Sequence, residues 1–197
     1  MSSFSTRLSF VGGTLLLEGM EFPAVDRVFD TTRWVWDARV RAWRCDAQQY
    51  AAVLRQFQLS GCTFEDQVPR WHAVQWPRLN LRPLRTDQTE AQAAWNPSRR
   101  GVIVMPTGTG KTEIALAILA QTAVSTLVVA PVRDLMYQWH RRILERLDYD
   151  AGVIGDQVFR VRPVSVTTYD SASIHMDRLG DQFGLIVFDE CHHLPGK

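Results

Sequence analysis

The sequence predicts an α/β protein, in which a parallel sheet with helices between its strands follows a small α+β domain. Four short apolar runs rich in β-branched residues favour the sheet, because such runs are typical of strands buried on both faces. They lie at 101–105, 125–130, 164–168 and 184–188. Helical stretches at 111–122 and 133–147 lie between them, so strands and helices alternate as a parallel sheet requires.

The first 68 residues predict the α+β domain, with elements in the order β-β-β-β-α-β. Two apolar runs around Gly12 and Gly13 indicate a hairpin. Residues 33–45 indicate a second strand pair, which carries three tryptophans. Large aromatic side chains usually build the core of so small a domain, and stacking on an unpaired base is the alternative.

Residues 46–60 predict the single helix of this domain. Asp46 and Gln49 have the spacing of a capping box, in which the two side chains cap each other's backbone N–H groups. The apolar residues that follow share one helical face: Tyr50, Val53, Leu54 and Phe57. Gly61 suits the end of the helix, and residues 62–68 indicate a last strand.

Three prolines in residues 69–83 predict an extended connector. We therefore expect the small α+β domain at 1–68, a linker at 69–83 and the α/β domain at 84–197.

A glycine-rich turn follows the first apolar run of the α/β domain. Residues 105–112 read MPTGTGKT, which matches the phosphate-binding loop G-x-x-x-x-G-K-[ST] except that Met105 stands at the first glycine. A strand, this turn and a helix opening at Lys111 together predict a nucleotide site, because backbone N–H groups and the helix N-terminus cradle phosphates. Lys111 is then expected to reach the outer phosphates, and the Thr112 hydroxyl to bind Mg²⁺.

An acidic pair follows the last apolar run. Asp189 and Glu190 come directly after residues 184–188. A strand-end aspartate is expected to hold Mg²⁺ in such a site, and the glutamate is expected to polarise the attacking water. Cys191 and the two histidines after it do not have the spacing of a zinc site.

The composition sets limits on these interpretations. The 22 basic and 21 acidic residues nearly cancel, so bulk charge gives no argument for nucleic-acid binding and any such surface must be local. All basic residues are arginine except Lys111 and Lys197, so one of the two lysines stands where a compact ammonium suits a phosphate. Three scattered cysteines indicate reduced thiols and a cytoplasmic setting, and no apolar run is long enough for a membrane helix.

Together these motifs resemble superfamily 2 helicases, and most of all XPB-like DNA helicases. Residues 188–195, FDECHHLP, resemble the DExH box of that group, and residues 130–139 and 166–172 resemble its motifs Ia and Ib. Residues 84–95 are similar to the adenine-reading segment. The N-terminal module is similar to the damage-recognition domain of the prokaryotic members, which implies a DNA-binding domain at 1–68.

The resemblance implies a first RecA-like lobe that uses ATP and Mg²⁺. The expected ATP-binding residues are Leu84, Arg85, Gln88, Pro106, Thr107, Gly108, Thr109, Gly110, Lys111 and Thr112. Lys111, Asp189 and Glu190 are the expected catalytic residues, with Thr112 and Asp189 on the metal. His192 is expected to couple the nucleotide state to the rest of the motor. Arg133, Gln138, Thr167 and Thr168 are the expected DNA contacts.

The resemblance also implies partners. We expect single-stranded or forked DNA, and a second RecA-like lobe, with its arginine fingers, that this stretch does not contain; a nuclease or a repair or transcription factor is a further expected partner. The sequence therefore indicates the N-terminal portion of a DNA-dependent ATPase and helicase with little turnover of its own. Two alternatives stay open: a motor subunit of a restriction or defence complex, and a non-catalytic DNA-binding or regulatory module.

Overall fold

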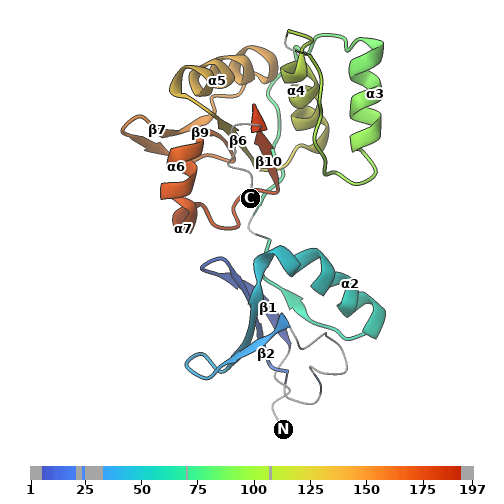
Figure 1. Cartoon of the computed structure of the whole chain (residues 1–197), viewed down its shortest axis with the longest axis vertical. Helices are drawn as coiled ribbons and strands as arrows, with labels where there is room; N and C mark the ends of the chain where they lie inside the picture. The colour runs from blue at the N-terminus through green and yellow to red at the C-terminus, as the bar shows by residue number, and fades with distance from the viewer. Residues whose placement is uncertain (1–5, 21–23, 25–32, 70, 107, 192–197) are drawn as a thin grey trace. The chain divides into compact units, whose positions relative to one another are not determined.

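The computed structural model describes residues 6–20, 24, 33–69, 71–106 and 108–191. The chain divides into two compact units, residues 1–70 with 177–181, and residues 71–176 with 182–197. Each unit has its own sheet and its own apolar core (Figure 1). Among the described residues, no helix is both long and apolar enough to cross a membrane.

The first unit is a five-stranded sheet with one long helix. Strands β1 (Arg7–Val11), β2 (Thr14–Glu18), β3 (Val35–Asp37), β4 (Ala42–Asp46) and β5 (Glu65–Asp66) lie in the order β3-β4-β2-β1-β5. The β1–β2 turn has Gly12 and Gly13 at φ 55° and 82°, the left-handed pair that a tight hairpin needs. Helix α2 (Tyr50–Ser60) packs Val53 and Phe57 against the sheet. Among the described residues of this unit, the five strands and the long helix follow the predicted order.

The predicted capping box is wrong in detail. The Asp46 carboxylate accepts a hydrogen bond from the backbone N of Gln48 (2.8 Å), so it caps a short 3₁₀ turn at Ala47–Gln49 rather than α2. The side chain of Gln49 instead accepts from Arg33 (2.5 Å). An intervening 3₁₀ turn moves the start of the α-helix to Tyr50, a shift that residue spacing alone does not reveal.

The second unit is a mainly parallel sheet with helices on both faces. Strands β6 (Thr126–Ala130), β7 (Gly152–Gly155), β8 (Val158–Arg160), β9 (Val164–Thr168) and β10 (Leu185–Phe188) lie in the order β10-β6-β9-β7-β8, and only β8 is antiparallel. Helix α5 (Arg133–Leu147) covers one face, and α6 (Tyr169–Ile174) lies on the other (Figure 1). Two further helices of this unit are α3 (Thr86–Trp95) and α4 (Lys111–Thr122), whereas α7 (Met176–Leu179) falls mostly in residues 177–181, which group with the first unit. The predicted fold class is confirmed.

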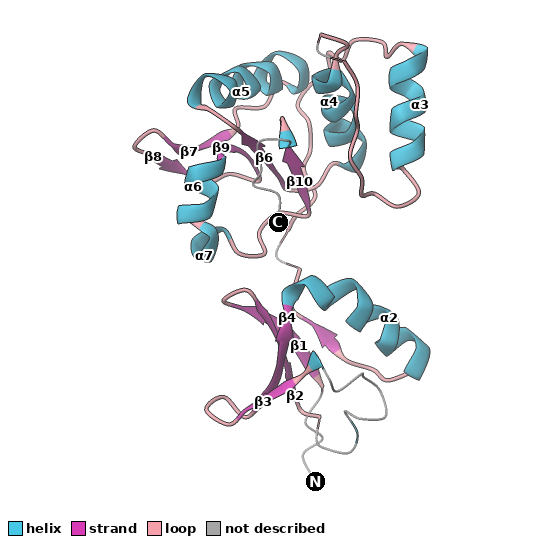
Figure 2. Ribbon diagram, in the orientation of Figure 1, coloured by secondary structure: helices cyan, strands magenta, loops and turns pink. Residues whose placement is uncertain are grey.

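One predicted strand is absent. Residues 101–105 form no ladder and are drawn as loop between α3 and α4 (Figure 2). Val102 and Val104 are 71% and 87% exposed, where a buried strand was expected. An apolar run becomes a strand only when a neighbour accepts its hydrogen bonds. In the described part of the chain β10 pairs with β6 alone, so residues 101–105 have no strand partner.

The connector is extended, as expected, but it belongs to the second unit. The backbone N of Val74 donates to Ala123 O (2.8 Å), and the N of Asn80 donates to Arg146 O (2.7 Å). The Trp76 indole donates to Ala120 O (3.2 Å). Residues from Trp71 onward therefore belong to the α/β unit and are hydrogen-bonded to it.

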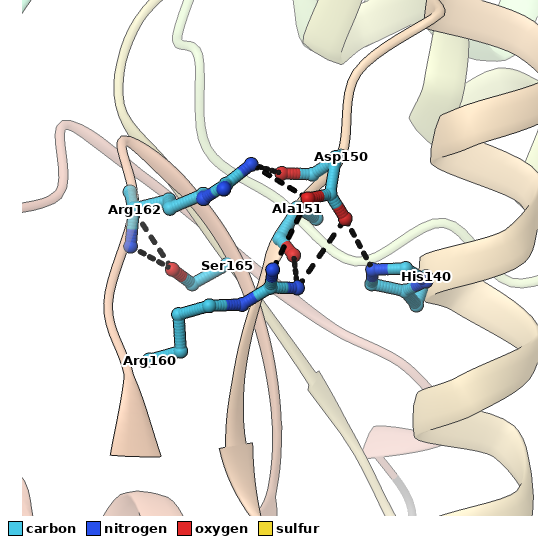
Figure 3. Close-up of polar contacts among 6 residues, drawn as sticks. All are labelled: His140, Asp150, Ala151, Arg160, Arg162 and Ser165. Atoms are coloured by element: carbon cyan, nitrogen blue, oxygen red, sulfur yellow. Dashed lines mark hydrogen bonds and ion pairs between the residues drawn. The ribbon is translucent and has the colours of Figure 1, made fainter. Parts of the chain in front are cut away.

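A charged cluster holds the β7–β8 hairpin against α5 (Figure 3). Asp150 accepts from Arg160 (3.1 Å) and Arg162 (2.8 Å) and lies 3.2 Å from His140 Nε2. Both guanidinium groups also donate to backbone carbonyls, those of Ala151 and Asp150. Burial alone would raise the pKa of Asp150, but Arg160 and Arg162 outweigh it and hold that pKa below its usual range. The ionised carboxylate therefore keeps the hairpin tied down at neutral pH.

Candidate functional site

The glycine-rich turn ends at the N-terminus of α4. Gly108 and Gly110 have φ values of 78° and 84°, and Gly110 is the N-cap residue of the helix. Both positions are strained for any residue with a side chain. The Thr109 hydroxyl and backbone N both bond to Pro106 O, which closes the turn. The loop therefore presents the free N–H groups of a helix start, the arrangement that binds anions. Thr107 lies outside the described residues.

Lys111 folds back over the beginning of this loop. Its Nζ donates to the carbonyl of Met105 at 3.0 Å and lies 3.5 Å from that of Pro106. Met105 therefore contributes a backbone oxygen, not a side chain, and the missing glycine does not disturb the loop. The ammonium is held beside the helix N-terminus, where exchanging two carbonyls for phosphate oxygens would strengthen its hydrogen bonds.

Gln88 links α3 to the loop. It is only 4% exposed. Its Oε1 accepts from the backbone N of Arg85 (3.0 Å), and its Nε2 donates to Thr109 O (2.8 Å). The Arg85 guanidinium donates to the same carbonyl (2.5 Å). A Cβ added at Gly110 would lie 2.5 Å from Gln88 Nε2, so a side chain here would have to displace the Gln88 amide from Thr109 O.

These bonds occupy both ends of the Gln88 amide. An amide nitrogen has two N–H donors and an amide oxygen has two lone pairs, so each end has capacity for one further hydrogen bond, such as one to adenine. Leu84 is half-buried beside this cluster, and Arg85 is exposed. The adenine-reading role of Leu84, Arg85 and Gln88 stays a prediction.

Asp189 is fixed at the end of β10 by two aromatic side chains. Its Oδ2 accepts from the indole Nε1 of Trp139 at 2.8 Å, and its backbone O accepts from the Tyr169 hydroxyl at 2.7 Å. Trp139 is 2% exposed, so this hydrogen bond is shielded from water. The Tyr169 ring stacks parallel to Phe188, with ring centroids 6.1 Å apart. Burial and the neighbouring charges of Cys191, Asp189 and Glu190 raise the pKa of Tyr169, so its hydroxyl stays a donor.

Neither aromatic residue was assigned this role from sequence. Trp139 is the last residue of the segment that resembles motif Ia, and Tyr169 directly follows Thr167 and Thr168, the predicted DNA contacts. A polar ring atom on an otherwise apolar helix face is the signal that points to such a partner, because buried Trp N–H and Tyr O–H groups usually find one.

The structure brings the predicted site residues together in two groups. Arg85, Gln88, Thr109 and Gly110 form one group around the loop, and Asp189 forms the other with Trp139 and Tyr169. Thr112 lies in the first turn of α4, half-buried. The joint binding of Mg²⁺ by Thr112 and Asp189 stays a prediction. Glu190 has a left-handed backbone at φ 50°. His192 lies outside the described residues.

The four predicted DNA contacts are placed very differently. The Arg133 side chain is 70% exposed and forms an ion pair with Asp156 (2.8 Å), and Gln138 is exposed on α5. Thr168 caps α6 by accepting from the N of Ser171. Thr167 is fully buried and its hydroxyl donates to Ile154 O (2.8 Å). The hydroxyl of Thr167 therefore lies inside the sheet, an arrangement that does not support its predicted phosphate contact.

The Trp139 bond predicts a measurable change in metal dependence. Trp139→Phe keeps an aromatic ring in the core, although a smaller one, and removes the donor to Asp189, so the carboxylate loses one restraint on its orientation. If Asp189 binds Mg²⁺, we expect the Mg²⁺ concentration for half-maximal ATP-analogue binding to rise about tenfold to a hundredfold, the usual cost of losing a group that orients a metal ligand. A titration with Mg²⁺, at fixed concentrations of the protein and of a fluorescent ATP analogue, measures this.

The matched control is Trp76→Phe. It removes an equivalent indole donor from the same core, but one that bonds to a helix carbonyl. We expect its Mg²⁺ dependence to match the parent chain. Equal shifts in both variants would show that only core packing was disturbed.

Comparison with known proteins identifies the family. Residues 81–197, more than half of the chain, match the family model described as ResIII, type III restriction enzyme, res subunit. The chain belongs to the ResIII family. Within this ResIII chain, residues 8–68 match a second model, the damage recognition domain of the xeroderma pigmentosum group B helicase. The resemblance to XPB-like helicases predicted from the motifs is thereby confirmed.

Individual relatives of this ResIII chain agree. It is 39% identical over 163 residues to DNA 3'-5' translocase XPB2 of Sulfurisphaera tokodaii, covering 82% of this chain and 37% of the relative. It is 36% identical over 125 residues to the putative DNA 3'-5' helicase Rad25 of Halobacterium salinarum, covering 60% of this chain and 20% of the relative. It is 29% identical over 135 residues to DNA 3'-5' helicase XPB of Mycobacterium tuberculosis, covering 63% and 24%. The chain therefore spans well under half the length of these relatives.

Proposed function

We propose that this chain is the N-terminal part of an ATP-dependent DNA helicase or translocase of the XPB type, acting in DNA repair or duplex opening. The observation that carries the proposal is the glycine loop with Lys111 at the start of α4, which follows an XPB-type damage recognition domain in the same chain. The relatives named above are 3'-5' translocases or helicases, and we propose the same polarity here.

The donor chemistry of the two groups fits Mg²⁺ and ATP. Mg²⁺ prefers one or two carboxylates, hydroxyls, waters and the substrate phosphates, and Thr112 with Asp189 offers the protein's share of that set. Bound MgATP supplies the phosphoryl group whose hydrolysis drives the motor. Lys111 and the backbone from Pro106 to Gly110, including Thr107 and Gly108, hold the phosphates, while Trp139 and Tyr169 fix Asp189.

Glu190 acts as the base in this proposal. It directly follows Asp189, and its carboxylate would accept the proton of the attacking water when MgATP is bound. Leu84, Arg85 and Gln88 bind the adenine end, since the Gln88 cluster already touches the loop. His192 relays the nucleotide state to the second RecA-like lobe, which supplies the arginines that neutralise transition-state charge.

DNA binds along the exposed ends of α5 and α6 in this proposal. Arg133 and Gln138 on α5 contact the phosphate backbone of the DNA, and so does Thr168 at the N-terminus of α6. The next residue, Tyr169, donates to the backbone O of Asp189 and so links this end of α6 to the nucleotide site. Single-stranded or forked DNA is the expected partner, and a nuclease or a repair or transcription factor is a further one. One relative is the XPB subunit of general transcription and DNA repair factor IIH of Schizosaccharomyces pombe.

The restriction-motor alternative keeps one supporting observation, the description of the family model itself. The damage recognition match over residues 8–68 favours the XPB type, because that module occupies the position before the motor lobe. The test of the proposal is whether the purified chain binds MgATP and DNA together, yet turns ATP over slowly without the second lobe.

A further inference from the structure

A hollow lies beside the β3–β4 hairpin of the N-terminal unit. Its volume is about 660 Å³, within the usual range for small-ligand sites. The side chains that matter for its chemistry are Thr14, Arg33, Val35, Asp37, Arg39 and Arg44. None of them belongs to the nucleotide site, and the activity proposed above does not use them.

The hollow lies on the sheet face that α2 does not cover. Val35 pairs with Arg44 across the β3–β4 ladder, so their side chains point to the same face. The next residue, Cys45, points to the other face, where it packs with Val53 and Phe57 of α2. Val35 is 70% exposed, so an apolar surface lies open beside the arginines.

Asp37 holds two arginines in fixed positions. Arg39 donates to it with Nε (3.0 Å) and Nη2 (2.9 Å), and Arg44 donates with Nε (3.3 Å). Arg44 also donates to the Thr14 hydroxyl (2.5 Å). The hydrogen bond from Arg39 lowers the pKa of Asp37 to about 2, so the carboxylate is ionised at any physiological pH. Each guanidinium has five N–H donors, so both keep donors for a ligand.

The charge of the lining suggests which anion fits. Three arginines face two carboxylates, Asp37 and Asp46, which leaves one net positive charge. A phosphodiester carries a single negative charge, whereas a free nucleotide carries two or more. Arginine held in a fixed fork is well suited to phosphate oxygens.

We propose that this hollow binds one backbone phosphate of an unpaired DNA strand, with the attached nucleoside packed against Val35. The inference deepens the proposed function by placing a DNA-strand site on the N-terminal domain. A nucleoside enters such a hollow only after leaving the base stack, which costs least where the strand is already unpaired.

The test is a charge reversal at Arg39. Its side chain is 87% exposed, so Arg39→Glu is expected to leave the fold intact, which a thermal melt checks. Fluorescence anisotropy of labelled forked DNA with the whole chain at fixed salt is expected to show at least a tenfold loss of affinity. The slope of affinity against salt is expected to fall by about one ion. Arg39→Gln, which removes the charge without adding one, is expected to lie between the two.

The matched control is Arg55→Glu, which makes the same change of charge on an exposed residue of α2. Helix α2 covers the opposite face of the sheet, so Arg55 does not line the hollow. We expect it to change the affinity less than threefold. Equal losses in the two variants would overturn the site, and so would forked DNA binding no better than plain duplex. Competition by deoxynucleoside monophosphate as strong as by single-stranded DNA would overturn the strand assignment.

This test separates the site from the wider proposal. If the site is wrong, the parent chain still binds forked DNA and Arg39→Glu does not weaken it. If the chain binds no DNA under any condition, the proposed function fails as well. MgATP binding is expected to be the same in the parent and in Arg39→Glu.

Discussion

Lys111→Ala is expected to weaken MgATP binding by about tenfold to a hundredfold. The ammonium lies at the start of α4, 3.0 Å from the Met105 carbonyl, where phosphate oxygens would replace the carbonyls as acceptors. Removing one charge-assisted hydrogen-bond partner costs about 1.5–3 kcal/mol, which gives this range. Calorimetric titration of MgATP into the chain measures the change.

Arg99→Ala is the control for the loss of a cation close to the loop in sequence. Arg99 is exposed and lies before the apolar segment that leads into the loop. We expect its MgATP affinity to stay within twofold of the parent chain. If Lys111→Ala also stays within twofold, the ammonium does not bind phosphate and the loop assignment is wrong.

Glu190→Gln is expected to separate binding from hydrolysis. The amide keeps the size of the side chain and leaves Asp189 with its Trp139 and Tyr169 partners, but it cannot accept a proton from water. We expect MgATP and DNA affinities within about threefold of the parent and a rate of hydrolysis about 10²- to 10⁴-fold lower, the usual contribution of a general base. The assay uses this chain joined to a second RecA-like lobe of the XPB type, in single-turnover conditions.

Glu113→Gln serves as the paired control. Glu113 is in the first turn of α4, close to the loop in sequence, and contacts Arg146 at 3.8 Å. We expect its hydrolysis rate to stay within about threefold. An equal loss in the two variants would remove the base role from Glu190.

The parts that sequence predicted well are those in which residue type alone sets the backbone. Gly12–Gly13, Gly61 and Gly110 all adopt left-handed φ values where turns or helix ends were expected. The buried strands β6 and β9 follow from runs of apolar and β-branched residues, because few other structures bury every residue in a run.

The parts that sequence missed depend on partners distant in the chain. Residues 101–105 have the composition of a strand, but pairing requires a neighbour that composition does not reveal. The Trp139–Asp189 bond joins residues 50 positions apart, so no local pattern encodes it. The hydroxyl of Thr167 donates to Ile154 O across the sheet, a partner 13 positions away that its motif does not reveal, and its phosphate contact stays a prediction.

MgATP titration into the whole 197-residue chain, with and without saturating forked DNA, tests the central proposal most directly. We predict one saturable site with a dissociation constant below about 1 mM, a typical level for enzymes that use this substrate. We also predict that bound DNA shifts this constant, because a motor of the proposed type couples its two sites, and MgATP would then shift the DNA affinity by the same factor. Little ATP is expected to be hydrolysed during the titration. A folded chain that shows no saturable MgATP binding, or rapid DNA-stimulated hydrolysis without a second lobe, would contradict the account.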